Sequence, residues 1–122
     1  MAELERTVND YCAALASRQA VPGGGGTSAL AGALGVSLGR MAAELTRGKP
    51  RYAAAEAELA ALSDEAEALR RTLLALSEQD AEAFAPLARA YGIPKDAPGR
   101  AETLEACLHT ACRTPMELLR QA

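Results

Sequence analysis

The chain lacks the residues from which β-sheets and aromatic cores are usually built. Its 122 residues include no tryptophan and one phenylalanine, and only four are valine or isoleucine. Such residues are enriched in strands, so their scarcity argues against a sheet. Alanine and leucine, which favour helix, are abundant instead, with 29 and 17 copies. We therefore expect an all-α protein, a helical bundle whose small side chains let the helices approach closely.

Basic runs and metal-binding patterns are also missing. The net charge is −3 and no basic block occurs, which argues against nucleic-acid binding. The three cysteines, Cys12, Cys107 and Cys112, are odd in number and follow no metal-ligand spacing. They are typical of reduced core thiols in a cytoplasmic protein. The single histidine, His109, has no Cys or Asp at metal spacing, so we expect a surface or packing residue and no metal site.

The uncharged stretch 20–39 is long enough to suggest a membrane span. It opens with a proline and four glycines, and its apolar part is short and rich in small residues. A buried helix of a soluble protein is therefore the better interpretation. Residues 1–19 carry acidic and basic side chains, unlike the apolar core of a signal peptide. No membrane association is expected.

Apolar residues recur at helical spacing along most of the chain. The longest stripe needs a partner helix, so we expect a long central helix with bundle packing or a dimer interface. We expect Pro86 to kink this helix, and Ser63 marks a place where it could break. Thr114-Pro115-Met116-Glu117 has the pattern of a new helix start. The predicted helices cover 3–17, from Thr27 or Ser28 to Arg47, 51–91, and 98–112 with Asp96 as a cap.

The predicted second helix has two contrasting faces. Each internal glycine costs about 1 kcal/mol relative to alanine, so close packing of the small face against another helix should offset that cost. Gly48 is suited to end this helix as a C-cap. One face is a ridge of large apolar residues, Leu30, Leu34, Leu38, Met41 and Leu45; the other is a groove of small residues, Ser28, Gly32, Gly35, Gly39 and Ala43.

A glycine-rich loop precedes this helix and is the first candidate for function. Successive glycines allow the backbone to approach a ligand closely, and free amides at a helix start attract anions. The loop is neither a P-loop nor a dinucleotide-binding fingerprint. A flexible turn is the alternative, but four glycines exceed what a plain turn needs. The candidate substrate-binding residues here are Pro22, Gly23, Gly24, Gly25, Gly26 and Thr27.

Asp80 is the second candidate because it interrupts an apolar stripe. It falls between Leu76 and Phe84, where the next apolar residue is expected. A carboxylate on a buried face is costly unless it is paired or functional. The alternatives are a partner arginine or a stripe that opens to solvent at this point. Glu78 and Glu82 fall off the stripe and are expected to be solvated.

The turn after the second predicted helix is the third candidate. Lys49, Arg51 and Tyr52 place two cations and a phenol at one helix junction, which suits an anionic group such as a carboxylate tail. Compensation of the helix dipole is the alternative explanation. We retain Lys49 and Tyr52 as candidate substrate-binding residues.

Together these segments resemble the formimidoyltetrahydrofolate cyclodeaminase / methenyltetrahydrofolate cyclohydrolase family. The run VPGGGGTSALAGALG at 21–35 resembles the family's signature, and LTRGK at 45–49 with Tyr52 resembles a second motif. DAEAF at 80–84 is similar to a third, and YGIPK at 91–95 also fits. The motifs occur in the right order over residues 1–122, so their combination is more specific than any single one.

The resemblance implies an all-helical homodimer that binds a reduced folate near the glycine loop. Such enzymes hydrolyse 5,10-methenyltetrahydrofolate to 10-formyltetrahydrofolate, or cyclise 5-formimidoyltetrahydrofolate with loss of ammonia. The residues fit this chemistry: we expect the Asp80 carboxylate to stabilise the cationic carbon or move protons, and the glycine-loop amides and Lys49 to hold the pteridine edge or the glutamate carboxylates. No cofactor beyond the folate substrate is implied.

Family members are usually longer, with further helices after the segment matching 114–122. We therefore expect residues 1–122 to form a single domain of this type without those C-terminal helices. No formiminotransferase domain is attached, which favours a stand-alone cyclohydrolase over a cyclodeaminase. The competing interpretation is a non-catalytic helical dimer, which would not bind a reduced folate.

Overall fold

The structure is a computed structural model that describes residues 2–121. Within this range it consists of helices and connecting turns, with no strand, so the predicted all-α class is confirmed. The elements in chain order are η1 (Glu3–Glu5), α1 (Val8–Leu15), α2 (Gly24–Thr46), η2 (Pro50–Ala55), α3 (Glu56–Tyr91), α4 (Arg100–Ala111) and α5 (Arg113–Gln121).

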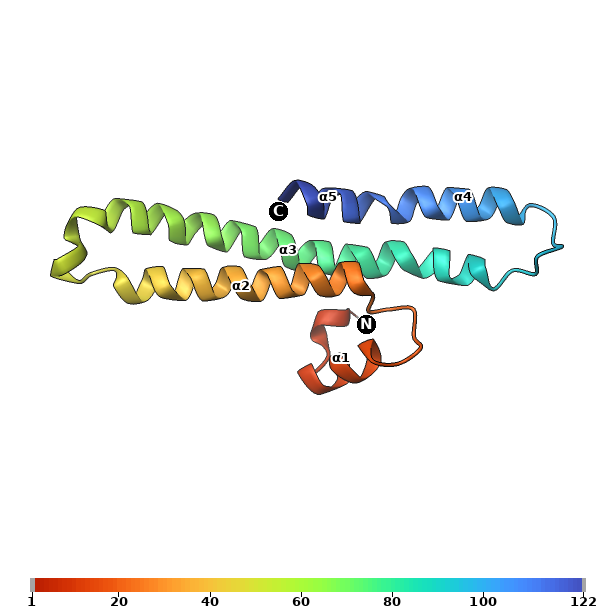
Figure 1. The fold of residues 1–122 in the computed structure, drawn as a ribbon, viewed down its shortest axis with the longest axis horizontal. Coiled ribbons are helices and arrows are strands. Elements are labelled where there is room, and N and C mark those ends of the chain that lie inside the picture. Colours follow the sequence, from red (N-terminus) through yellow and green to blue (C-terminus); the bar gives the residue numbers. More distant parts are fainter. Residues whose placement is uncertain (1, 122) are drawn as a thin grey trace.

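The long helix α3 lies in the middle of the molecule (Figure 1). It packs antiparallel to α2 along one side, and α4 and α5 return along its other side, one after the other. The short helix α1 lies apart from this layer, next to the N-terminal end of α2. The start of α2, the middle of α3 and the α4–α5 junction therefore come close together.

Small side chains form the contact between α2 and α3, as expected, but they match the predicted set only in part. Ala29, Ala33 and Ala43 are buried, and a side chain on Gly32 would meet Leu73. Gly35 and Gly39 have open space where a Cβ would be. The prediction is therefore correct for Gly32 and Ala43, but it missed Ala29 and Ala33 and wrongly included Gly35 and Gly39.

The apolar ridge of α2 is largely uncovered. Leu34, Leu38, Met41 and Leu45 are each more than half exposed, because the small face, and not the ridge, packs against α3. A row of large apolar side chains on one exposed helix face is unusual for a monomer. The ridge is therefore an unoccupied contact surface in a single chain.

The structure corrects the start of α2. The sequence predicted a start at Thr27 or Ser28, with the glycines outside the helix, but α2 begins at Gly24. The amide of Thr27 already donates to the carbonyl of Gly23 over 3.0 Å. A carboxylate from α3 binds the first turn, and this tertiary contact outweighs the low helix propensity of glycine.

The first predicted helix is also shorter than expected. Instead of one helix over 3–17, the chain forms η1 and then α1, separated by extended backbone at Arg6 and Thr7. The side-chain oxygen of Thr7 accepts a hydrogen bond from the Asp10 amide. This N-cap starts a new helix at Val8.

The remaining boundaries differ by a few residues. The segment 50–55 is a 3-10 helix, and α3 then continues without a break past Ser63 and through Pro86. Gly48, at φ 76°, ends α2 as predicted. Gly99, at φ 75°, precedes α4 in place of the predicted cap Asp96. The fifth helix starts at Arg113, one residue before the predicted cap Thr114, which is buried.

None of the helices described combines the length and the apolar character needed to cross a membrane.

Candidate functional site

Asp80 binds the glycine turn at the start of α2. Its Oδ2 accepts a hydrogen bond from the Gly26 amide over 2.8 Å. One turn earlier on α3, the buried Ser77 hydroxyl donates to the Gly26 carbonyl, also over 2.8 Å. Both backbone groups of Gly26 are thus held by one turn of α3. The sequence singled out the glycines and Asp80 separately, and the structure brings them together.

The close approach explains why two of these positions are glycine. A Cβ on Gly25 would lie 2.8 Å from Oδ1 of Asp80, and one on Gly26 would lie 3.1 Å from the Ser77 carbonyl oxygen. Any side chain at these positions would push the carboxylate or the helix backbone away. The glycines therefore allow a carboxylate to sit against the helix start.

Asp80 has no arginine or lysine partner among the residues that the structure describes. The first amides of a helix carry partial positive charge, which favours an anion at that place. Asp80 is such an anion, supplied by α3. Since only Oδ2 is used by Gly26, Oδ1 is available for a ligand.

A cavity of about 300 Å³ opens next to this carboxylate. Its polar end is formed by Gly24, Gly25 and Asp80, and its walls are mainly apolar. An apolar slot with a few polar groups at one end is typical of a small-molecule site. The walls come from the glycine loop, α3 and the α4–α5 junction: Ala20, Gly23, Phe84, Leu87, Leu108, Ala111, Cys112 and Pro115.

Sequence reasoning missed the contribution of α4 and α5. Leu108 belongs to no motif and Pro115 only to a helix-start pattern, so only the fold places them in the wall of the cavity beside Asp80. Phe84 lies one helical turn after Asp80, so both side chains project from the same face of α3. Phe84 was the part of this wall that the sequence could have indicated, because it is the single phenylalanine of the chain.

Glu78 corrects a second expectation. The sequence predicted a solvated side chain, but Glu78 is half-buried and its carboxylate accepts hydrogen bonds from the amides of Glu3 and Leu4. Glu82 is exposed, as predicted. No local pattern could have indicated this contact, because its partners lie more than 70 positions away.

Lys49 and Tyr52 lie beyond the C-terminal end of α2, whereas the glycine turn lies at its N-terminal end (Figure 1). The 23 residues of α2 separate them, which corresponds to about 35 Å at 1.5 Å per residue. Arg51 stacks over the Tyr52 ring at 5.6 Å from its centre. Within one chain these candidates cannot reach a ligand that contacts Asp80.

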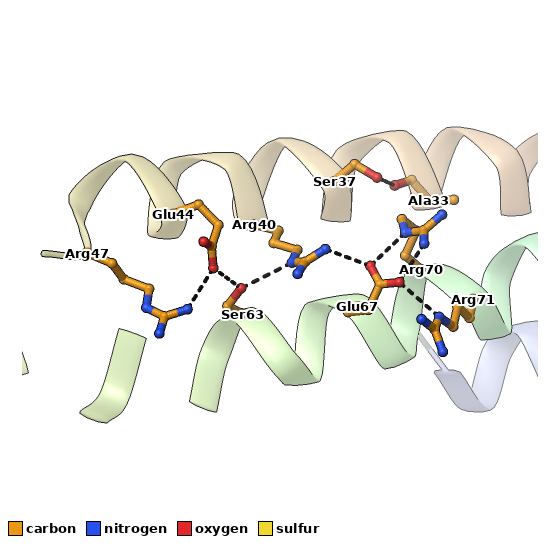
Figure 2. Close-up of polar contacts among 9 residues, drawn as sticks. All are labelled: Ala33, Ser37, Arg40, Glu44, Arg47, Ser63, Glu67, Arg70 and Arg71. Carbon is orange, nitrogen blue, oxygen red and sulfur yellow. Dashed lines mark hydrogen bonds and ion pairs between the residues drawn. The ribbon is translucent and has the colours of Figure 1, made fainter. Parts of the chain in front are cut away.

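A chain of ion pairs joins α2 to α3 between these two ends (Figure 2). The hydroxyl of Ser63, which is fully buried, donates to Glu44 and accepts from Arg40. Arg40 continues to Glu67, which also binds two arginines of its own helix, Arg70 and Arg71. These hydrogen bonds, above all those from Arg70, lower the pKa of Glu67 from 4.5 to about 2. Every oxygen of Glu67 is occupied by the protein, which indicates a structural role.

The cysteines and the histidine show no sign of a metal centre. Cys12 and Cys112 are exposed free thiols, which corrects the prediction of core thiols, and Cys107 is half-buried. His109 is exposed, as predicted, at a surface recess between α3, α4 and α5. Among residues 2–121 no three His, Cys, Asp or Glu side chains gather as metal ligands.

Comparison with known proteins agrees with this geometry. A sequence model of the formiminotransferase-cyclodeaminase family matches residues 7–122, which include the glycine turn, Asp80 and both walls of the cavity. The chain belongs to this family. Its fold matches the crystal structure of formiminotetrahydrofolate cyclodeaminase from Thermotoga maritima with a TM-score of 0.78 and 32% identity, over 97% of this chain and 57% of that one.

Two proteins similar in sequence to this chain have names that point to different reactions. The chain is 38% identical to methenyltetrahydrofolate cyclohydrolase from Methylorubrum extorquens, over 93% of this chain and 57% of that protein. It is 29% identical to the mouse formimidoyltransferase-cyclodeaminase, over 94% of this chain and 22% of that protein. The chain thus spans little more than half of the cyclohydrolase and about a fifth of the mouse protein.

Proposed function

We propose that the chain acts in tetrahydrofolate one-carbon metabolism, hydrolysing 5,10-methenyltetrahydrofolate to 10-formyltetrahydrofolate in the cytoplasm. The observation that carries the proposal is the free oxygen of Asp80 at the polar end of an apolar cavity. The sequence identity of 38% with a methenyltetrahydrofolate cyclohydrolase supports this reaction. Cyclodeamination of 5-formimidoyltetrahydrofolate is the second candidate, supported by the cyclodeaminase relatives.

The reaction requires a base beside a cationic carbon. In the substrate, one carbon bridges N5 and N10 and carries delocalised positive charge. A carboxylate next to this carbon stabilises the cation and accepts a proton from the attacking water. The bond from the carbon to N5 then breaks as N5 takes a proton, which leaves the formyl group on N10. One water is consumed and one net proton is released, so the proposed reaction needs no further cofactor.

The cavity suits a flat bicyclic ring. Phe84 and Leu108 offer apolar surface to its faces, while the backbone of Gly24 and Gly25 lies at the same end as Asp80. Ring burial between such walls excludes bulk water and strengthens the interaction between the carboxylate and the cation. In this arrangement the reduced folate is the small-molecule partner, and the reacting carbon faces Asp80.

The proposal includes a homodimer formed through the exposed ridge of α2. Two copies of α2 packed antiparallel about the centre of the ridge would cover Leu34, Leu38, Met41 and Leu45. The same pairing brings the partner's Lys49 and the partner's Tyr52 to the end of α2 that carries the glycine turn. The two sets of candidate residues then meet at one pteridine edge, although they lie far apart within each chain.

The substitution Asp80→Asn tests the catalytic role. Asparagine retains an oxygen that accepts from Gly26, so the glycine turn should stay in place while the negative charge is lost. We expect the enzyme-dependent loss of 5,10-methenyltetrahydrofolate absorbance to fall by about a hundredfold, with an unchanged melting temperature. Glu82→Gln, an exposed carboxylate on the same helix, is the matched control and should keep full activity.

The outcomes separate the candidate functions. Full activity of Asp80→Asn would remove Asp80 from the mechanism. A wild-type protein that does not hydrolyse the methenyl compound, but releases ammonia from 5-formimidoyltetrahydrofolate, would establish the cyclodeaminase. A folded protein that binds no reduced folate would support the non-catalytic helical dimer.

A further inference from the structure

The N-terminal segment contacts α3 beside the residues that hold the glycine turn, and α2 directly after that turn. We call residues 2–15, which include η1 and α1, the N-terminal arm. At one end of the arm, the Glu78 carboxylate accepts from the amides of Glu3 and Leu4, over 3.0 Å for Glu3. At the other end, the buried Tyr11 hydroxyl is hydrogen-bonded to the Thr27 hydroxyl over 3.1 Å.

These contacts form a closed circuit of bonded segments that includes the glycine turn. Glu78 lies between Ser77 and Asp80, the two residues of α3 that hold Gly26. Thr27, the arm's other anchor, directly follows Gly26. The circuit therefore runs from α3 to Gly26, on to Thr27, through the arm, and back to α3. A turn held from both sides in this way has little freedom to move relative to Asp80.

Apolar packing of the arm is limited to a few side chains, so its polar contacts matter for its position. Val8 is 80% exposed and Leu15 is exposed at the far end of α1, while only Tyr11 and Ala14 of α1 are buried. Figure 1 shows α1 separated from the layer of long helices. Loss of a single hydrogen bond at either anchor should thus release the arm without unfolding the α2–α3 pair.

We propose that the N-terminal arm is a positioning element of the folate site, with Glu78 and Tyr11 as its positioning residues. Neither residue lines the cavity beside Asp80, so both act through the glycine turn. The inference rests on the proposed function for its effect on catalysis. Its structural part, that the arm restrains the turn, does not depend on which reaction occurs.

Hydrogen exchange of the full chain tests the structural part. We expect faster amide exchange in peptides covering 22–30 for Glu78→Ala and for Tyr11→Phe, with no change over 59–70. The matched controls are Glu82→Ala and Tyr91→Phe, whose side chains are exposed; they should leave both regions unchanged. Exchange over 22–30 that stays at the wild-type rate in both arm variants would overturn the inference.

Steady-state kinetics on 5,10-methenyltetrahydrofolate tests the functional part. Misplacement of a binding element lowers kcat/KM, and we expect a loss of about tenfold in Tyr11→Phe with an unchanged melting temperature. Thr27→Val should cause the same loss, and the double variant Tyr11→Phe/Thr27→Val should be no worse than either single one. Additive losses would show two independent effects and would overturn the role of this hydrogen bond.

The two parts of the test fail in different ways. A wild-type chain that turns over neither folate substrate would refute the proposed function, while faster exchange in the arm variants would still support the restraint. Normal kinetics in an active enzyme, with or without faster exchange, would refute a positioning role for the arm.

Discussion

Gly25 has no room for a side chain, because a Cβ there would lie 2.8 Å from Oδ1 and 3.1 Å from Cγ of Asp80. The aspartate is short and already bound to Gly26, so it can yield only by turning its carboxylate away. We expect Gly25→Ala to reduce kcat/KM by at least about tenfold, while the chain stays folded. Steady-state kinetics and thermal melting measure the two effects separately.

Gly35 provides the comparison for that substitution. It lies in the same helix but has open space at the Cβ position. Alanine there should raise the stability by about 0.5–1 kcal/mol, since helix propensity is the main change, and should leave activity unaltered. Equal activity of Gly25→Ala and Gly35→Ala would contradict a catalytic arrangement of Asp80 against the glycine turn.

Single residues differ in how well the sequence revealed them. Asp80 could be predicted because it replaces an apolar residue in a regular stripe, and the glycines because their number exceeds the needs of a turn. Glu78 and Tyr11 could not, since a hydrogen bond to a backbone amide distant in sequence leaves no local pattern. Lys49 stays a prediction, because its place in a site depends on a second subunit.

At the scale of helices, α2 and α3 are held together by buried alanines along α2 and by a chain of hydrogen bonds and ion pairs in its second half (Figure 2). The carboxylate of Glu67 receives hydrogen bonds from Arg40, Arg70 and Arg71. Arg40 is the contact that crosses from α2 to α3. A slip of one helix along the other would leave these charges unpaired, so the network favours a single alignment.

The pKa of Glu67 gives this interface a dependence on pH. Because the folded-state pKa is lowered from 4.5 to about 2, the stabilisation is present above pH 4.5 and is lost as the pH falls towards 2. Glu67→Gln lacks this ionisation. We expect wild type to be more stable than the variant at pH 7, and the difference to shrink between pH 4.5 and 2. Urea unfolding across this pH range measures it; a constant difference would contradict the pairing.

The helices themselves were predictable, but several of their ends were not. Helical spacing of apolar residues revealed the long segments, and Gly92, Ile93 and Pro94 indicated the stop after Tyr91. The start of α2 was misplaced because Asp80 and Ser77 stabilise glycines that have a low intrinsic preference for helix. The packing face of α2 was only partly predicted, because the pattern treats glycine and alanine alike as small residues. It did not distinguish the buried Ala29 and Ala33 from Gly35 and Gly39, which have open space at the Cβ position.

The molecule as a whole is an elongated layer of helices with little interior (Figure 1). The apolar residues that are buried are mostly alanine and leucine, and the ridge of α2 stays exposed. A small domain buries a limited share of its surface and gains stability from association. The shape of the molecule and the exposed ridge thus both favour a second copy.

A charged residue in the ridge tests this association. Leu38→Glu should convert the proposed dimer into a monomer, because antiparallel copies of α2 would place two buried carboxylates near each other. Sedimentation equilibrium measures the mass, and the proposed site across two subunits predicts a parallel loss of activity. The control Leu119→Glu replaces another exposed leucine, on α5, and should leave the mass unchanged. A wild-type chain that is monomeric at high concentration would refute the dimer.

The spacing between Gly25 and Asp80 also limits how such sequences can diverge. A side chain at position 25 and a carboxylate at position 80 compete for the same space, so a lineage that acquires one is under pressure to lose the other. Relatives that carry alanine or a larger residue at the position of Gly25 should therefore have lost the carboxylate at the position of Asp80, or the reaction. These two positions in a sequence alignment would then distinguish active enzymes from inactive descendants.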